Sequence, residues 1–151
     1  MIRIRRAVPS DLETVLQMRY ETMRTVCGFT QEHEFSEVFY TESERYFRQG
    51  DQVTVLAWDG ETAIGCASIC YISVMPTFSH PSGKRAHIMN VYVRDSHRRQ
   101  GIARSMLEQL IMDARQRCAT QITLDATPVG RPLYESLGFE VSEEGMVINL
   151  T

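Results

Sequence analysis

The sequence predicts one α/β domain with a mixed, twisted β-sheet. Three observations support this prediction: a strand-helix-strand unit, a β-hairpin and the length of the chain. A strand-like run at residues 86–93 precedes helical apolar spacing over 102–114 and a β-branched run at 121–125. These three segments predict two parallel strands joined by a helix. The 151 residues, 43% of them hydrophobic, provide for one core, so we expect residues 1–151 to form a single domain.

The hairpin prediction makes the sheet mixed. Runs rich in β-formers at 53–58 and 62–72 flank Asp59-Gly60, a dipeptide that favours a tight antiparallel turn. Turn-forming residues then fill 75–84, which we expect to be a surface loop before the strand at 86–93.

The N-terminal third reads as a strand followed by helix. Alternating residues near the start predict the strand, and Ser10 and Glu13 have the spacing of a capping box. The helix that they would begin has an apolar stripe running to Gly28, a residue suited to a helix end. Residues 30–48 are predicted to be further helix.

The C-terminal segment is predicted to hold a short helix and a last strand. Pro132 suits a first helical turn and Gly138 suits a helix end, which places Tyr134 on the helix. We expect a final β segment around residues 146–150.

Charge and composition exclude several classes of protein. A net charge of −3 and a pI of about 5.8 leave no broad basic surface for nucleic acid. No window approaches the roughly 20 apolar residues of a membrane span, and the N-terminus does not resemble a secretory signal. We therefore expect no membrane partner and a cytoplasmic location.

The cysteines and histidines do not predict a metal site. Four scattered cysteines fit a reducing compartment rather than a disulfide framework. Cys66 and Cys70 would lie roughly 13 Å apart on an extended strand, so we expect buried thiols rather than shared metal ligands. The four histidines also lack metal-ligand spacing.

The segment Arg98-Arg-Gln-Gly-Ile-Ala103 is a candidate anion-binding loop, because it lies between a predicted strand and a predicted helix start. Unpaired N–H groups at a helix start bind phosphate, and Gly101 removes the β-carbon that would block its approach. An ordinary solvated helix start, with arginines facing water, is the competing interpretation. The segment lacks the Gly-Lys-Ser/Thr of a Walker loop and the three glycines of a dinucleotide site.

Two separated motifs, Arg98-x-x-Gly101-x-Ala103 and Leu133-Tyr-Glu-Ser-Leu-Gly-Phe139, resemble those of the GCN5-related N-acetyltransferases (GNAT). The resemblance covers residues 86–140 and implies a GNAT-like sheet flanked by helices. It also implies transfer of an acetyl group directly from acetyl-CoA to an amine acceptor, with no metal. Homodimers are frequent in the family, although the sequence shows no interface signature.

The resemblance further implies where acetyl-CoA would bind. Its pyrophosphate would lie on the loop and helix start, and its pantetheine beside strand residues 91–93. The later turn departs from the family pattern, because Thr127 and Gly130 replace Asn and Ala. The expected cofactor-binding residues are Val91, Tyr92, Val93, Arg98, Arg99, Gln100, Gly101, Ile102, Ala103, Arg104 and Thr127.

Two residues are candidates for proton transfer. An alkyl amine is neutral in only about one molecule in two thousand at pH 7, so it must lose a proton before it can attack. His87 could accept that proton, because it matches the strand position where relatives carry a glutamate base. The alternatives are a histidine that only packs, or deprotonation through ordered water. Tyr134 matches the family's general acid for the departing thiolate; a tyrosine that only anchors its helix is the alternative.

The acceptor side is less clearly marked. Asn90 is a candidate substrate-binding residue, and the N–H of Val91 could donate to the reacting carbonyl oxygen, especially at a β-bulge. A cluster of glutamates would suit a cationic amine, or would simply form a solvated face. Its members are Glu32, Glu34, Glu37, Glu42 and Glu44.

Two other functions are compatible with the same candidate anion-binding loop. A noncatalytic acyl-CoA-binding sensor would not need His87 and Tyr134. An acetylating toxin that acts on RNA would need a basic acceptor surface, which the acidic balance of the chain argues against.

Overall fold

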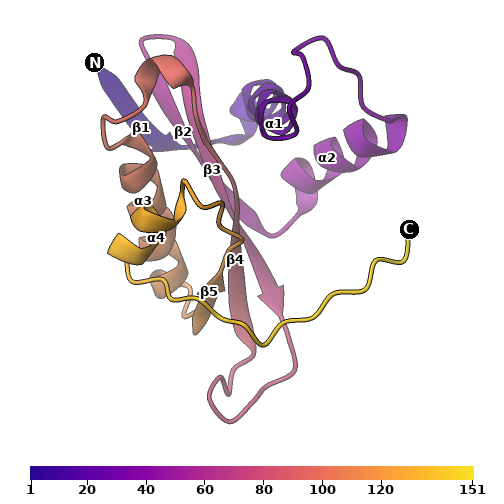
Figure 1. The fold of residues 1–151 in the computed structure, drawn as a ribbon, viewed down its shortest axis with the longest axis vertical. Helices are drawn as coiled ribbons and strands as arrows, with labels where there is room; N and C mark the ends of the chain where they lie inside the picture. The colour runs from indigo at the N-terminus through magenta and orange to yellow at the C-terminus, as the bar shows by residue number, and fades with distance from the viewer.

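The computed structural model describes all 151 residues as a five-stranded sheet with helices on both faces (Figure 1). The strands are β1 (Ile2–Arg6), β2 (Gln52–Asp59), β3 (Thr62–Ser73), β4 (Lys84–Val93) and β5 (Gln121–Thr123). The helices are α1 (Leu12–Val26), α2 (Glu37–Gln49), α3 (Ile102–Gln116) and α4 (Arg131–Ser136), with 3-10 turns η1 (Pro9–Asp11) and η2 (Asp95–His97).

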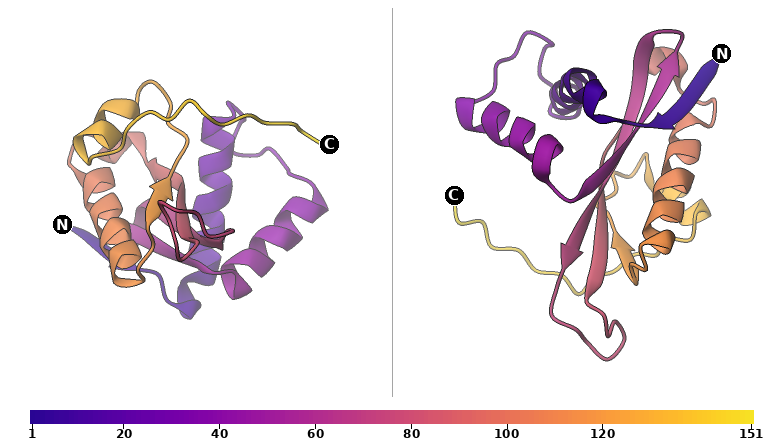
Figure 2. Two further views of the ribbon diagram at one scale, coloured as in Figure 1. Left: turned by 90° about the horizontal axis from the view of Figure 1, so that it is seen from below. Right: turned by 180° about the vertical axis from the view of Figure 1, so that it is seen from behind.

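The sheet is mixed, as predicted. Its strand order is β1-β2-β3-β4-β5; neighbours from β1 to β4 are antiparallel, and β5 is parallel to β4. The predicted turn joins β2 to β3, with Gly60 at φ +62°. Helices α1 and α2 cover one face of the sheet, and α3 covers the other (Figure 2).

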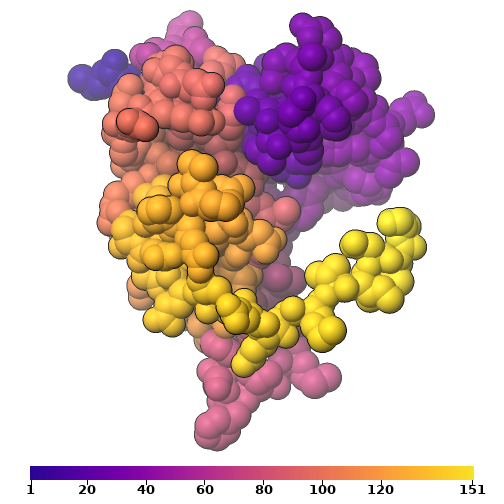
Figure 3. Space-filling model, in the orientation of Figure 1, coloured from indigo at the N-terminus to yellow at the C-terminus, as the bar shows by residue number.

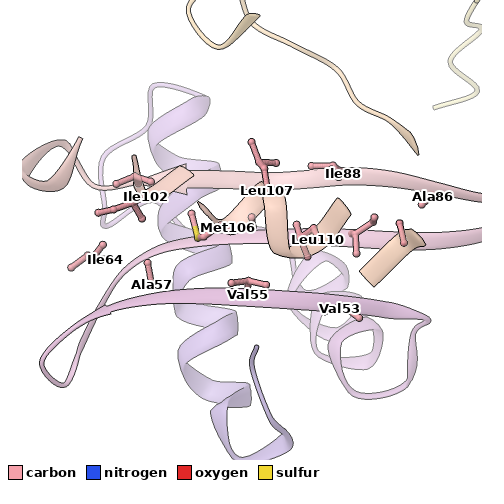
Figure 4. Close-up of a cluster of buried hydrophobic side chains, with 14 residues drawn as sticks. Val53, Val55, Ala57, Ile64, Ala86, Ile88, Ile102, Met106, Leu107 and Leu110 are labelled. Carbon is pink, nitrogen blue, oxygen red and sulfur yellow. The ribbon is translucent and has the colours of Figure 1, made fainter. Parts of the chain in front are cut away.

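The main core lies between α3 and the sheet (Figure 4). Helical spacing places Met106, Leu107 and Leu110 on one face of α3, and none of the three is exposed. They meet side chains that alternate inward from β2, β3 and β4. This packing fixes the start of α3 relative to the end of β4, the feature that positions the site.

The start of α1 differs from the prediction. Ser10 and Glu13 form no capping box, because residues 9–11 make a 3-10 turn and α1 begins without a side-chain cap. Asp11 supplies the local polar contact instead: one carboxylate oxygen accepts from the Val8 N–H at 2.8 Å, and the carboxylate also accepts two hydrogen bonds from Arg5.

The predicted helix over 30–48 is shorter in the structure. Ser36 caps α2 by accepting from the Phe39 N–H at 3.1 Å, so the helix begins at Glu37. Residues 30–36 instead form an irregular segment, in which the ring of His33 stacks on that of the preceding Phe29 at a centroid distance of 3.9 Å.

The predicted strand at 146–150 is absent. Residues 140–151 have no regular structure, and the C-terminal end of this segment extends away from the body of the molecule (Figure 3). β5 pairs only with β4, so no strand contacts the apolar residues near the C-terminus, and β-propensity without a partner does not produce a strand. Met146, Val147, Ile148 and Leu150 are each more than 80% exposed.

Two further observations bear on the predictions. No helix has the combination of length and apolar character required to cross a membrane. Cys66 is buried as expected, whereas Cys70 is partly exposed and Cys27 and Cys118 are exposed.

Candidate active site

The edge of β4 that faces β5 is open along half of its length. β5 pairs with β4 only at residues 85–87, where the last pair joins His87 to Thr123. No strand pairs with that edge from Ile88 to Val93, so its backbone groups are available to an extended ligand. The open edge runs toward the loop that leads into α3 (Figure 1).

A β-bulge interrupts β4 in the middle of this edge. Met89 pairs with Ser68 and Tyr92 with Cys66, so Asn90 and Val91 together face the single residue between Ser68 and Cys66. Asn90 has φ +61°, an uncommon conformation for a residue other than glycine. The strand is therefore bulged at Asn90 and Val91, the condition under which the sequence made the Val91 N–H a candidate donor.

The bulge is held by side chains from the neighbouring elements. Cys66 donates its S–H to the carbonyl oxygen of Asn90 at 3.3 Å, and burial raises the pKa of the Cys66 thiol to about 11. The thiol is therefore protonated and able to donate at neutral pH. On the helical side, Arg19 of α1 donates to the side-chain oxygen of Asn90 at 3.1 Å.

The start of α3 has the features of an anion site. Gly101 is the N-cap at φ +77°, no side chain caps the helix, and a β-carbon at Gly101 would meet nothing within 4 Å. The N–H groups of Ile102, Ala103 and Arg104 lie in the first helical turn, where no helical carbonyl is available to accept from them. They can therefore donate to an anion, and the helix dipole favours negative charge here.

The three arginines of this segment have different surroundings. Arg98 donates to the Val93 carbonyl at 3.1 Å and pairs with Asp95, whereas Arg104 contacts Glu108 and Ser136. Arg99 is exposed, has φ +62° and forms no ion pair, and its neighbour Gln100 is also exposed. Arg99 is thus the arginine of this loop that is free to bind an anion.

Tyr134 lies on α4 and packs against the ring edge of Phe139, with a centroid distance of 6.0 Å. Burial raises the pKa of Tyr134, so the phenol keeps its proton at neutral pH. Its hydroxyl forms no hydrogen bond within the protein. A β-carbon on Gly130 would lie 3.2 Å from the ring, so the glycine is closely packed against the tyrosine.

Thr127 supports the turn before α4. Its hydroxyl oxygen accepts from the Gly130 N–H at 3.2 Å, and its carbonyl accepts from the N–H groups of Gly130 and Arg131. The hydroxyl proton of Thr127 is left to donate to a ligand.

His87 lies where β4 and β5 separate. Its Nδ1 is 2.7 Å from the hydroxyl oxygen of Thr123, and its Nε2 is 3.8 Å from the carboxylate of Asp125. The strand rise separates His87 from Val91 by roughly 13 Å of chain. The structure therefore does not bring His87 within hydrogen-bonding distance of the Val91 N–H, and these two groups lie at different points of the open edge.

The glutamates of the expected acceptor segment lie on an exposed face. Glu34 accepts from the hydroxyl of Tyr40, Glu42 pairs with Arg45, and Glu44 pairs with Arg48. Such exposed contacts belong to a solvated helix surface.

Sequence reasoning missed Arg19. The buried face of α1 contains Val15, Met18 and Thr22, and Arg19 lies four residues after Val15 on the same side of the helix. A charge within an apolar stripe was the available signal. Arg94 was also missed: it holds Glu21 of α1 through two hydrogen bonds of 2.9 and 2.8 Å and so fixes α1 against the end of β4.

The larger of the two main cavities, about 830 Å³, lies elsewhere. It is bounded by the C-terminal half of α3, by β5 and by residues 137–144. The open edge of β4 and the start of α3 do not line it, so cavity size does not identify the site in this protein.

Comparison with known proteins agrees with this geometry. Among curated relatives, the chain is 29% identical over 87 residues to glucosamine 6-phosphate N-acetyltransferase of Trypanosoma brucei brucei, covering 58% of this chain and 57% of that protein. It is 26% identical over 101 residues to the uncharacterized N-acetyltransferase YsnE of Bacillus subtilis (strain 168), covering 63% and 61%. The matches thus span less than two thirds of the length of these relatives.

Solved structures match over nearly the whole chain. A predicted acetyltransferase with acetyl-CoA from Clostridium acetobutylicum superposes with a TM-score of 0.88 at 28% identity, covering 99% of this chain and 97% of that one. A GCN5-related N-acetyltransferase from Ralstonia eutropha JMP134 shares the fold, with a TM-score of 0.82 at 23% identity and full coverage of both chains. The model of the acetyltransferase (GNAT) family matches residues 15–139, and the chain belongs to that family.

Proposed function

We propose that this chain transfers an acetyl group from acetyl-CoA to a primary amine. The observation that carries the proposal is the open edge of β4, which runs from a bulge to a helix start without a side-chain cap. These features fit the donor: Gly101 leaves space for a phosphate, Arg99 is an exposed cation, and the β4 backbone can pair with an extended amide chain. When bound, acetyl-CoA supplies the activated acetyl group.

The bulge would orient the reacting carbonyl. We assign the N–H of Val91 the role of donating to the carbonyl oxygen, where negative charge develops during transfer. Cys66 and Arg19 hold the neighbouring Asn90, so this donor would be positioned before the acceptor arrives.

His87 would remove the proton from the attacking amine. Its ring is held by Thr123, which leaves one nitrogen toward Asp125 and solvent. Because His87 and Val91 lie at different points along β4, we propose that the proton passes through an ordered water.

Tyr134 would stabilise the departing thiolate. A thiol has an ordinary pKa of about 8.5 and a tyrosine about 10, so full proton transfer costs roughly 2 kcal/mol before burial is considered. Since burial raises the pKa of Tyr134 further, we assign its unbonded hydroxyl a hydrogen-bonding role during thiolate formation.

The test is release of CoA thiol from acetyl-CoA with a panel of primary amines. We expect Tyr134→Phe and His87→Ala each to lower kcat about a hundredfold, the lower range for a positioned proton donor or base. Tyr71→Phe is the matched control. It also removes a tyrosine hydroxyl, but the hydroxyl of Tyr71, near the end of β3, contacts Asp113 of α3 and has no assigned role in the reaction. Acetyl-CoA binding without thiol release for any amine would contradict transfer; full activity in both variants would contradict the assigned roles.

A further inference from the structure

Arg19 is a half-buried cation without an anionic partner. Of the five N–H donors of its guanidinium, one contacts the protein, at 3.1 Å from the side-chain oxygen of Asn90. Burial lowers the pKa of Arg19, and only nearby thiols act in the opposite direction. The carboxylates that make ion pairs elsewhere in the chain do not contact it. A buried charge is costly unless it is paired.

Other arginines in comparable positions have partners. Arg94 makes two hydrogen bonds to Glu21, and Arg5 makes two to Asp11. Arg24, also on α1, donates to the His33 carbonyl at 2.8 Å and lies over the ring of Phe35. Arg19 differs from them in making a single hydrogen bond, with neither a carboxylate nor an aromatic ring as a further partner.

Asn90 adds a second unsatisfied donor beside it. The side-chain oxygen of Asn90 accepts from Arg19, so the amide nitrogen, Nδ2, is the group of that side chain left to donate. That nitrogen is buried and has no hydrogen-bond partner. A buried donor without a partner lowers the stability of the fold. Two adjacent groups with only donors to offer favour a ligand rich in acceptors, that is, an oxyanion.

The position of the pair connects it to the reaction. Asn90 immediately precedes Val91 in the bulge, and Arg19 reaches Asn90 from α1, on the face opposite α3. On the proposed function, Val91 marks the place of the reacting carbonyl. An anion on Arg19 would therefore lie close to the amine that attacks there, and both groups would belong to one small molecule.

We infer that the acceptor is an amine that also carries a carboxylate or a phosphate, bound by Arg19 and the amide nitrogen of Asn90. The inference rests on the proposed function and narrows its acceptor class. It differs from the expectation based on the acidic segment, whose glutamates are exposed and largely paired.

Matched acceptors test it directly. Three pairs each contain one member with an anionic group and one without it: phosphoethanolamine and ethanolamine, glucosamine 6-phosphate and glucosamine, and alanine and alaninamide. We expect kcat/KM to favour the anionic member of at least one pair by about tenfold or more, the range of a charge-assisted hydrogen bond. Arg19→Gln should lower kcat/KM for the anionic member at least about tenfold more than for the neutral member, and Arg19→Lys should restore part of the preference.

The control is Arg115→Gln, which removes an exposed α3 charge that has no ion pair and should keep the preference. Equal or better use of the neutral members would overturn the inference. An equal loss for both members in Arg19→Gln would also overturn it, because a purely structural role of Arg19 predicts that result.

A binding measurement covers the case in which none of these amines reacts. Calorimetry with inorganic phosphate, on protein saturated with CoA so that the α3 start is occupied, should give heat that Arg19→Gln removes. Absent heat, or heat unchanged in Arg19→Gln, would contradict the anion site. Loss of CoA binding itself would instead contradict the proposed function, so the two failures are distinguishable.

Discussion

At the scale of single residues, the candidate site depends on backbone conformations that most side chains avoid. Gly101, Asn90 and Arg99 all have positive φ values, at the helix start, in the bulge and in the loop between them. Such conformations cost about 1 to 3 kcal/mol for residues other than glycine and cluster at functional sites. The two non-glycine examples lie next to groups that we assign to donor and acceptor binding.

Comparing Gly101→Ala with Gly60→Ala should separate the effect of backbone strain on stability from the effect of the substitution on CoA binding. Both glycines have positive φ and open space at the β-carbon position, so each substitution should lower the free energy of unfolding by about 1 kcal/mol. Only Gly101→Ala should weaken CoA binding, because only that β-carbon faces the expected phosphate. Chemical denaturation and calorimetry measure the two quantities; equal CoA affinities in the two variants would contradict the assignment.

The pH dependence of turnover follows from the direction of the Tyr134 shift. Because burial raises the pKa of Tyr134, its proton is retained up to and beyond pH 10. The rate should therefore rise with pH as the amine deprotonates, with no loss from Tyr134 ionisation below about pH 10. The kcat profile from pH 6 to 10 tests this, and a descending limb near pH 8 that disappears in Tyr134→Phe would contradict it.

At the scale of elements, local patterns predicted the segments that build the core. The hairpin around Asp59-Gly60 and the strand, helix, strand unit were predictable because turn chemistry and apolar spacing agree with the tertiary packing. The segment 30–36 was not, since Ser36 competes as a helix cap and the aromatic rings pack among themselves. The absent strand at 146–150 shows the same limit, because strand formation depends on a partner.

The environment of each element also sets its sensitivity to substitution. Leu110→Ala should cost about 2 to 5 kcal/mol of unfolding free energy, because Leu110 is fully buried between α3 and the sheet. Ile148→Ala should change it by less than about 0.5 kcal/mol, since Ile148 is 82% exposed. Urea denaturation compares them, and a large loss for Ile148→Ala would show that residues 146–150 pack against the protein.

At the scale of the molecule, ion pairs tie the N-terminal strand to helices on both faces. Arg5 of β1 holds Asp11 before α1, and Arg6 of β1 contacts Asp113 of α3 at 3.3 Å. The candidate anion-binding loop at residues 98–103 was predictable because its residues are contiguous in sequence. Arg19 and Asn90 are 71 residues apart, so only the folded chain brings that pair together.

Acid should destabilise the fold through Asp11. Hydrogen bonds from Arg5 lower the pKa of Asp11, so its contribution to stability is present above the ordinary value near 3.9. That contribution is lost as pH falls through the lower pKa of the folded state. Asp11→Asn should therefore lower the Tm at pH 7 and flatten its decrease between pH 4 and 2. Glu61→Gln, at an exposed position, should leave the Tm profile unchanged; identical profiles for both variants would contradict the role of Asp11.

The central claim is that the start of α3 and the open edge of β4 bind acetyl-CoA through its diphosphate. Calorimetry comparing CoA with pantetheine, which lacks the diphosphate and the adenosine 3′-phosphate attached to it, tests it most directly. Three or four charge-assisted hydrogen bonds predict that CoA binds with one-to-one stoichiometry and at least about a hundredfold more tightly than pantetheine. Equal affinities for the two compounds, or no heat with CoA, would contradict the claim.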